Sequence, residues 1–243
     1  MQDVAVIIPA KDEADRIADT VEAARGLPGA DLVVVVDDGS SDGTARVAER
    51  VGARVVRHGR NRGKGCAMES GAEAVKLLED GREEPRHLLF LDADLAGTAS
   101  EAAPLVEPVR RGEADMSIAV FATTVKLGGH GLVVRLSREG IRRATGWEAT
   151  QPLNGQRCLT RPAFEAARPL AAGFGVETAL TIDLLRRGFR VTEVEVPLAH
   201  RATGTDWRAQ AHRARQLRDV ARALAVRDPA VAGRLARVRG PRP

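Results

Sequence analysis

The chain has 243 residues, of which 44% are hydrophobic and 29% are charged, and its formal net charge is +4. This balance is typical of a soluble globular domain and excludes an intrinsically disordered chain. No apolar stretch approaches the roughly 18 residues of a membrane-spanning helix, and we see no signal-peptide pattern before the first strand. Cys66 and Cys158 are isolated, without zinc-site or disulfide spacing, so we expect a reducing, cytoplasmic location.

Strand-like and helix-like patterns alternate along the first half of the chain. Short apolar, β-branched runs predict strands, and apolar residues three or four apart predict helices. The predicted strands are 4–8, 32–36, 54–57, 87–91 and 116–120, and the predicted helices begin near Ile17 and cover 44–51, 64–78 and 98–111. Asp42 is expected to cap the helix 44–51 and Gly52 to end it. This alternation predicts an α/β fold, a doubly wound, Rossmann-like, mostly parallel sheet with helices on both faces.

The second half of the chain is less regular. It predicts helices over 132–145 and 177–187, strands over 156–160 and 190–196, and a final amphipathic helix over 206–226. We therefore expect one domain over residues 1–205, with a basic helix and tail over residues 206–243 packed on it.

The C-terminal segment 208–243 is rich in arginine. Such a segment is either a solvated face or a surface for acidic lipid or nucleic acid. The apolar stripe of the last helix is narrow and has few large side chains, whereas a membrane-binding helix carries more bulky ones. Its members are Leu217, Val220, Ala221, Leu224 and Ala225. We expect this stripe to pack on the domain, without a nucleic-acid partner and with membrane association less favoured.

Four polar clusters follow predicted strands. They are Pro9-Ala10-Lys11-Asp12-Glu13, Asp37-Asp38-Gly39-Ser40, the loop 58–64 and Asp92-Ala93-Asp94. Doubly wound sheets bind ligands beyond the carboxyl ends of their strands, so we expect the four clusters to form one site.

Asp92 and Asp94 directly follow the apolar run that ends at Leu91. Unpaired buried carboxylates are costly, so the two side chains should face a cleft and meet compensating charge. A hard divalent cation that already holds a diphosphate needs only one or two protein carboxylates. The alternative is a solvated turn in which Asp94 caps the next helix.

The loop 60–65 combines three basic side chains with two glycines. Lys64 opens a predicted helix, so its ammonium and the helix N-terminus can face a diphosphate. The loop lacks Walker spacing, and no Gly-x-Gly-x-x-Gly follows the first strand, which counts against a dinucleotide-binding domain. Asp38 can accept a hydrogen bond from the ring N–H of uracil or guanine; alternatively, Asp37 and Asp38 only shape a turn.

Together these segments resemble the GT-A glycosyltransferases of the family 2 type. The likeness covers roughly residues 4–208 and rests on the clusters above together with downstream segments. Those segments are Asn154-Gly155-Gln156-Arg157, Gly173-Phe174-Gly175-Val176-Glu177, and Glu195-Val196-Pro197 followed by His200-Arg201 and Gly204. Among family members, the chain is similar to polyprenyl-phosphate sugar synthases and glucosyl-3-phosphoglycerate synthases.

The resemblance implies a donor that is a UDP- or GDP-linked sugar. It places Pro9, Ala10, Lys11 and Glu13 along the nucleoside, Asp38 on the base and Lys64 near the diphosphate, and it includes Asp92 and Ala93 among the residues that bind the nucleotide sugar. Asp94 would ligate Mg²⁺ or Mn²⁺, Asp92 would bond the ribose or a metal-bound water, and His200 would complete the metal site. Arg201 and Arg208 would grip the diphosphate or an acceptor phosphate. A strand-end histidine bonded to backbone is the alternative for His200.

On the acceptor or sugar side, the resemblance places Asn154, Gly155, Gln156 and Glu177. Glu177 is the best candidate for a catalytic base, because it begins a helix after the flexible Gly173-Phe174-Gly175. It can instead bind a sugar hydroxyl or cap its helix. An acceptor phosphate is already ionised and needs no base, so the stereochemical course stays open.

The sequence thus predicts a metal-dependent hexosyltransferase with a small, soluble acceptor, which can be phosphorylated, and a homodimer is compatible with it. A polyprenyl-phosphate acceptor at the membrane surface is the alternative. A nucleotidyltransferase is less favoured, because its loop after the first strand is usually Gly-rich and 9–13 has no glycine. A non-catalytic sensor has no need of Asp92, Asp94, Lys64 and His200 together.

Overall fold

The computed structural model describes residues 3–79, 81–121, 131–197 and 207–228, except for the side chains of residues 207–213. None of the helices in these ranges is long and apolar enough to cross a membrane. His200, Arg201 and the side chain of Arg208 lie outside the described residues, so their predicted roles stay predictions.

A seven-stranded sheet forms the centre of the described chain, in the order β3-β2-β1-β4-β6-β5-β7. The strands are β1 (Val4–Ala10), β2 (Ala30–Asp37), β3 (Arg54–Arg57), β4 (His87–Phe90), β5 (Met116–Phe121), β6 (Arg157–Leu159) and β7 (Val191–Val196). All neighbours pair in parallel except β6, which is antiparallel to both β4 and β5. The predicted α/β class with a mostly parallel sheet is confirmed.

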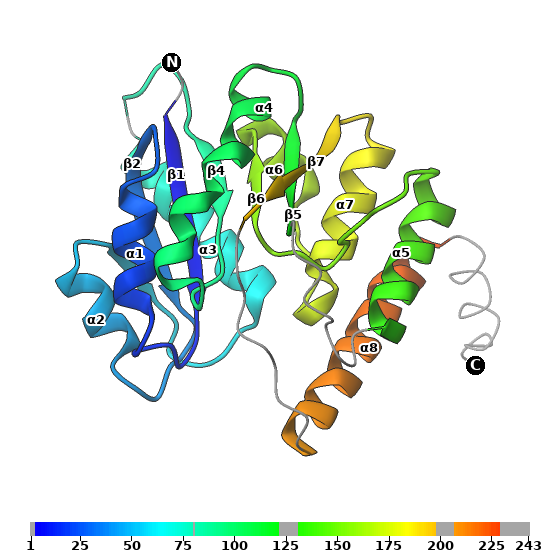
Figure 1. The fold of residues 1–243 in the computed structure, drawn as a ribbon, viewed down its shortest axis with the longest axis horizontal. Coiled ribbons are helices and arrows are strands. Elements are labelled where there is room, and N and C mark those ends of the chain that lie inside the picture. Colours follow the sequence, from blue (N-terminus) through cyan, green and yellow to red (C-terminus); the bar gives the residue numbers. More distant parts are fainter. Residues whose placement is uncertain (1–2, 80, 122–130, 198–206, 229–243) are drawn as a thin grey trace, which may run out of the picture.

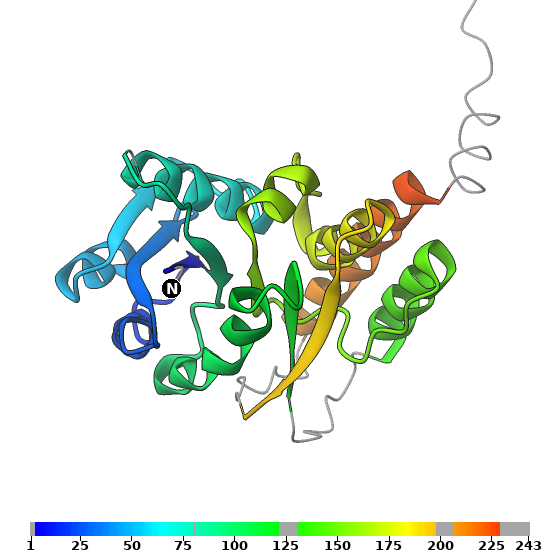
Figure 2. The same ribbon diagram turned by 90° about the horizontal axis from the view of Figure 1, so that it is seen from above.

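Helices cover both faces of this sheet (Figures 1 and 2). One face carries α1 (Ile17–Arg25), α2 (Thr44–Arg50), the 3₁₀ helix η1 (Ala96–Leu105) and α4 (Val106–Arg110). The other carries α3 (Lys64–Leu78), α6 (Arg161–Ala167) and α7 (Val176–Arg186), which follows the 3₁₀ turn η2 (Gly173–Gly175).

The alternation of side chains along β1 explains the two layers. Val6 and Ile8 pack towards α1, whereas Ala5 and Ile7 pack towards α3, as expected for successive residues of a strand. Gly71 lets α3 approach closely, because a Cβ there would lie 2.4 Å from Cγ2 of Ile7. The first residues of α3 are thereby fixed at the carboxyl end of the sheet.

Two further helices, α5 (Gly131–Thr145) and α8 (Trp207–Arg227), lie beyond α7, away from the sheet (Figure 2). A small apolar cluster of Ile141, Ala149 and Ile182, with Leu224 against it, joins α5, α7 and α8. α8 also contacts η2.

The buried face of α8 differs in part from the expected stripe. Val220 is buried and Leu217 and Leu224 are half-buried, but Ala221 is exposed and Ala223 is buried. A helix advances 3.6 residues per turn, so residues 220, 223 and 224 share a face that turns residue 221 to solvent.

Two elements differ from the sequence prediction. The helix expected over 98–111 is the 3₁₀ helix η1 followed by the short α4, because Pro104 inside it cannot donate an α-helical hydrogen bond. Helix α6 was not predicted. Its start is marked by Thr160, whose hydroxyl accepts the N–H of Ala163, and by Pro162 in the first turn.

Asp42 stabilises the start of α2, although the N-cap position is Gly43. The carboxylate of Asp42 accepts the N–H of Thr44 at 2.9 Å. Helix α2 ends at Arg50, and Gly52, with φ of 86°, turns the chain as predicted.

Candidate functional site

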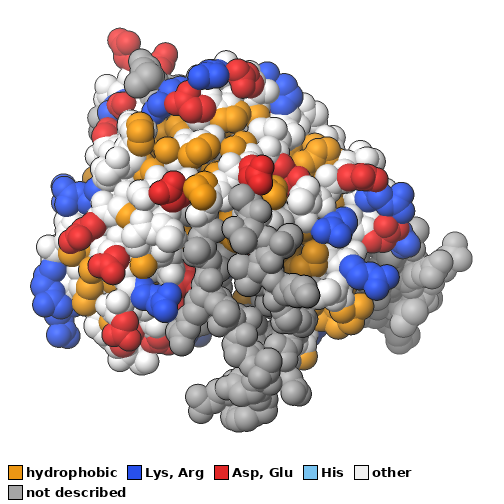
Figure 3. All heavy atoms as spheres, in the orientation of Figure 1, with side chains coloured by type: hydrophobic (Ala, Val, Ile, Leu, Met, Phe, Trp, Pro, Cys, Tyr) orange, Lys and Arg blue, Asp and Glu red, His pale blue; other side chains and the backbone are white. Residues whose placement is uncertain are grey.

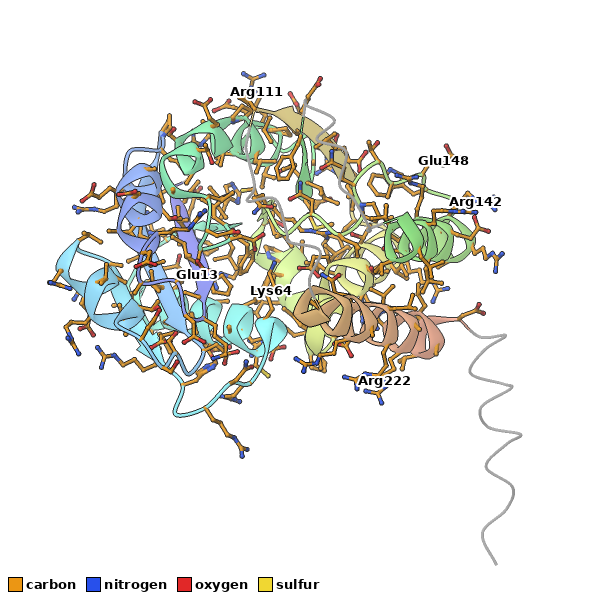
Figure 4. All side chains as sticks on the ribbon, turned by 60° about the horizontal axis from the view of Figure 1, so that its bottom comes forward. Glu13, Lys64, Arg111, Arg142, Glu148 and Arg222 are labelled. Atoms are coloured by element: carbon orange, nitrogen blue, oxygen red, sulfur yellow. The ribbon has the colours of Figure 1, made fainter. Side chains whose placement is uncertain are left out.

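The four polar clusters lie at one edge of the sheet, which faces the viewer in Figure 4. Ala10 pairs with Asp37 at the ends of β1 and β2, and Ile7 pairs with Phe90 at the end of β4. The segments that follow these strands therefore start side by side, as the parallel topology requires.

Lys64 lies at the centre of this edge (Figure 4). Its ammonium is 2.7 Å from Oδ1 of Asp92 and 2.9 Å from Oε1 of Glu177, which is buried in the first turn of α7. Burial opposes the charge on Lys64, but the negative charges of Asp92 and Glu177 outweigh it and raise the pKa of Lys64 above its usual value. The ion triad joins the donor cluster to the predicted acceptor side. A compensating charge for Asp92 was predicted, but the pairing of Lys64 with Glu177 was not.

The short antiparallel strand β6 brings the predicted segment 154–156 to the same place. The amide Nε2 of Gln156 donates to Oδ2 of Asp92 at 2.8 Å. A Cβ at Gly155 would lie 2.4 Å from Nζ of Lys64 and 2.8 Å from Oδ1 of Asp92, so only glycine fits without displacement. Oδ1 of Asn154 accepts the N–H of Gln156 at 3.0 Å and holds the turn.

Arg157 is the largest fully buried side chain in the described chain. Its guanidinium donates to the carbonyl oxygens of Pro152, Asn154 and Glu177. Burial lowers the pKa of Arg157 to about 10, while the charges of nearby carboxylates oppose that shift. Arg157 thus ties the 152–154 turn to the first turn of α7. The motif containing it was noted in the sequence, but this role was not predicted.

Asp38 organises the basic loop rather than standing open to solvent. Its carboxylate accepts the N–H groups of Arg62 at 2.7 Å and Gly63 at 2.8 Å, and Oδ1 lies 2.7 Å from Nδ1 of His58. Nε2 of His58 is in turn 2.9 Å from Oγ of Ser70. These contacts occupy most of the acceptor capacity of a carboxylate, and Asp38 is only 5% exposed. Its role on a base stays a prediction.

The cluster after β1 is joined to the cluster after β2. Nζ of Lys11 donates to the carbonyl of Gly39 at 3.2 Å, and the N–H of Glu13 donates to Oγ1 of Thr44 at 2.9 Å. The N–H of Ser41 donates to Asp12 and is the main reason why the pKa of Asp12 falls to about 2. Pro9 and Ala10 are the final two residues of β1, so the sheet holds the backbone at the start of the predicted nucleoside-binding segment.

Asp94 is half-exposed at the same edge, and its backbone carbonyl accepts Nη1 of Arg16 at 3.3 Å. Within the described residues, no group of three or more His, Cys, Asp or Glu side chains could hold a metal ion. Asp92 and Asp94 supply the carboxylates that a divalent ion bound to a diphosphate requires, so the donor set is chemically suitable. Both oxygens of Asp92 bond Lys64 or Gln156, so a metal ion at Asp92 would have to share that carboxylate with them.

The family model described as "Glycosyl transferase family 2" matches residues 5–153. The chain belongs to this family. The matched region contains Lys64, Asp92 and the segments that follow β1, β2 and β4.

Two curated relatives have similar sequences. "Glycosyltransferase AglJ" of Haloferax volcanii is 33% identical over 210 residues, which cover 84% of this chain and 65% of that protein. "Undecaprenyl-phosphate 4-deoxy-4-formamido-L-arabinose transferase" of Edwardsiella ictaluri is 28% identical, over 82% of this chain and 60% of that protein. The chain thus spans less than two thirds of the length of either relative.

Among solved structures, glucosyl-3-phosphoglycerate synthase from Mycobacterium tuberculosis, in complex with Mn²⁺, uridine diphosphate and phosphoglyceric acid, matches with a TM-score of 0.75. The sequences are 26% identical, and the match covers 93% of this chain and 78% of that one. Another structure of that enzyme contains Mg²⁺ and uridine diphosphate. The match confirms the predicted GT-A fold.

Proposed function

We propose that the protein transfers a sugar from a nucleotide-diphosphate sugar to a small, water-soluble acceptor, with Mg²⁺ or Mn²⁺ as cofactor. The observation that carries this proposal is the position of Lys64 between Asp92 and Glu177. A cation at this point can bind a diphosphate, and a carboxylate beside it can face an acceptor, at the sheet edge where ligands of such folds bind.

On the donor side, Lys64 binds the diphosphate and thereby leaves Glu177. Pro9, Ala10, Lys11 and Glu13 line the nucleoside, and Asp38 holds the loop from which Lys64 emerges. Asp94, with Asp92 and His200, would hold the metal ion, and Arg201 would contact the diphosphate. The metal ion, when bound, would neutralise the charge of the leaving diphosphate. UDP is the donor nucleotide that the structural relatives favour.

On the acceptor side, Glu177 faces the space that Lys64 vacates. For a hydroxyl acceptor, it takes the proton of the attacking oxygen; for a phosphate acceptor, it holds a sugar hydroxyl instead. Gln156 keeps Asp92 oriented at 2.8 Å, and Gly155 leaves room for the ammonium of Lys64. The likeness to an enzyme crystallised with phosphoglyceric acid supports a small phosphorylated acceptor.

A lipid acceptor is the second candidate, favoured by the name of the Edwardsiella ictaluri relative. The two candidates differ in the acceptor and share the donor chemistry. Both therefore require the same ion triad, and only the acceptor decides between them.

Thermal shift with a panel of nucleotide sugars, with and without Mn²⁺, tests the donor. A ligand that binds only the folded state raises the melting temperature, so one nucleotide should stabilise the protein in the presence of metal. Turnover of that donor with 3-phosphoglycerate and with undecaprenyl phosphate then separates the acceptors. If no nucleotide sugar stabilises the protein, with or without metal, the proposal is refuted. Transfer to undecaprenyl phosphate alone would establish the lipid candidate.

A further inference from the structure

Helix α8 touches the candidate site at η2, the turn that leads into Glu177. Oδ2 of Asp219 accepts the backbone N–H of Phe174 at 3.3 Å. The side chain of Asp219 is 14% exposed, and its other oxygen accepts Nε of Arg218 at 3.3 Å. A carboxylate from the C-terminal helix is therefore bonded to the backbone three residues before Glu177.

The two glycines of η2 are required by the approach of α8. A Cβ at Gly173 would lie 2.2 Å from Oδ2 of Asp219, and Gly173 has φ of 66°, which favours glycine. A Cβ at Gly175 would lie 2.7 Å from the carbonyl oxygen of Asp219 and 2.7 Å from Cβ of Ala223. The backbones of α8 and η2 therefore approach so closely that no side chain fits between them.

The opposite side of this segment rests on the start of α3. A Cβ at Gly65 would lie 2.5 Å from the carbonyl oxygen of Ala171, and the N–H of Leu170 donates to Glu69 at 2.7 Å. Residues 170–175 are thus held between the helix that carries Lys64 and the helix that carries Asp219. Glu177 follows two residues later and pairs with Lys64 at 2.9 Å.

We propose that Asp219 is a positioning residue, which acts through η2 to fix the carboxylate of Glu177 against Lys64. The C-terminal helix is then part of the wall of the active site. The role of Glu177 in turnover rests on the proposed function, but the ion pair that Asp219 positions is present in the free protein.

A double-mutant cycle on UDP binding tests this inference. In the free protein, Glu177 competes with a diphosphate for the ammonium of Lys64. A misplaced Glu177 should therefore raise the affinity for UDP with Mn²⁺, by about two- to fivefold for one partly exposed ion pair. Asp219→Ala should have this effect in the parent and none in the Glu177→Gln background, where the competing charge is already gone. Turnover of the donor should fall in the Asp219→Ala single variant.

The controls separate hydrogen bonding from charge and from folding. Asp219→Asn retains an acceptor oxygen and should behave as the parent, as should Arg222→Ala on the exposed face of α8. If Asp219→Ala does not fold, Asp219→Ser is used in its place, because the serine side chain is too short for its hydroxyl to reach the N–H of Phe174. Hydrogen exchange at residues 173–178 should rise in Asp219→Ala or Asp219→Ser, but not in Asp219→Asn or Arg222→Ala.

Two results would overturn the inference. One is an equal change of UDP affinity in both backgrounds, which would make Asp219 a structural residue only. The other is an unchanged exchange rate at residues 173–178. If the parent protein bound no UDP, the proposed function would fail, and the exchange measurement would still decide whether Asp219 holds η2.

Discussion

At the scale of single residues, the site depends on one shared cation. Lys64 pairs with both Asp92 and Glu177, which lie on different elements, so each carboxylate has a cationic partner although the triad as a whole keeps a net charge of about −1. A ligand with negative charge can replace either partner without leaving Lys64 unpaired. The resting site is therefore compatible with both the empty and the diphosphate-bound state.

Replacement of this cation should weaken the binding of UDP strongly. Lys64→Ala removes a charge-assisted contact, worth about 1.5–3 kcal/mol, and leaves two carboxylates facing the diphosphate. Uridine should bind almost as before. Isothermal titration with UDP and with uridine measures both affinities, and Lys76→Ala, an exposed lysine of the same helix, is the matched control. Equal losses for UDP and uridine would mean that Lys64 only supports its loop.

Asp94 should be essential for metal-dependent binding and dispensable for folding. It is half-exposed, so Asp94→Ala opens no cavity in the core and should melt close to the parent. Its affinity for UDP should no longer increase when Mn²⁺ is added, and its turnover should be abolished. Asp15→Ala, an exposed carboxylate after β1, serves as control. Near-parental turnover of Asp94→Ala with chelator present would contradict the metal assignment.

Asp38 shows where prediction from residue type ends. The sequence indicates that an acidic side chain lies beside the ligand edge, and the structure agrees. The sequence does not indicate that the carboxylate bonds the N–H groups of Arg62 and Gly63, because that depends on how the loop 58–63 folds back. Local chemistry thus predicts the place of the residue, but not its partners.

At the scale of elements, all seven strands of the described sheet were predicted, because apolar residues between turn residues mark each of them. The antiparallel direction of β6 was not predicted, since three residues carry no directional signal. This direction places Gly155 and Gln156 against Asp92. The Lys64–Glu177 contact was not predicted either, because the two residues are 113 positions apart in the chain and no local pattern indicates a contact over that separation.

The turn before β6 provides a test at this scale. Gly155→Ala adds a Cβ 2.4 Å from Nζ of Lys64, so the lysine must leave Asp92 or the turn must shift. We expect donor turnover to fall by about tenfold or more, as for a misplaced active-site group, with a smaller effect on the melting temperature. Gly97→Ala tests whether an added methyl group alone matters, because that position has open space and no positive φ. Unchanged turnover in Gly155→Ala would show that the close approach is not required.

At the scale of the whole molecule, charged side chains are distributed over the face that Figure 3 shows and do not gather in one patch. Acidic and basic side chains are interspersed over the described part of that face in Figure 3. The exposed side of α8 is more basic, with Arg215, Arg218 and Arg222 directed to solvent. The opposite side packs on α5, α7 and η2. The helix therefore combines a buried apolar face with an exposed cationic one.

This arrangement predicts that the protein binds anionic vesicles only at low salt. An interfacial helix must insert its apolar face into the lipid, but Val220 is fully buried and Ala223 is 6% exposed against the protein. Attraction of the exposed arginines to anionic lipid remains, and ions screen it over about 8 Å at physiological salt. Sedimentation with phosphatidylserine vesicles should thus show pelleting at low salt that is lost at physiological salt. The combined change of Arg215, Arg218 and Arg222 to Glu should abolish the low-salt pelleting as well. Salt-resistant pelleting would show that another part of the chain inserts into lipid, and it would favour the polyprenyl-phosphate acceptor.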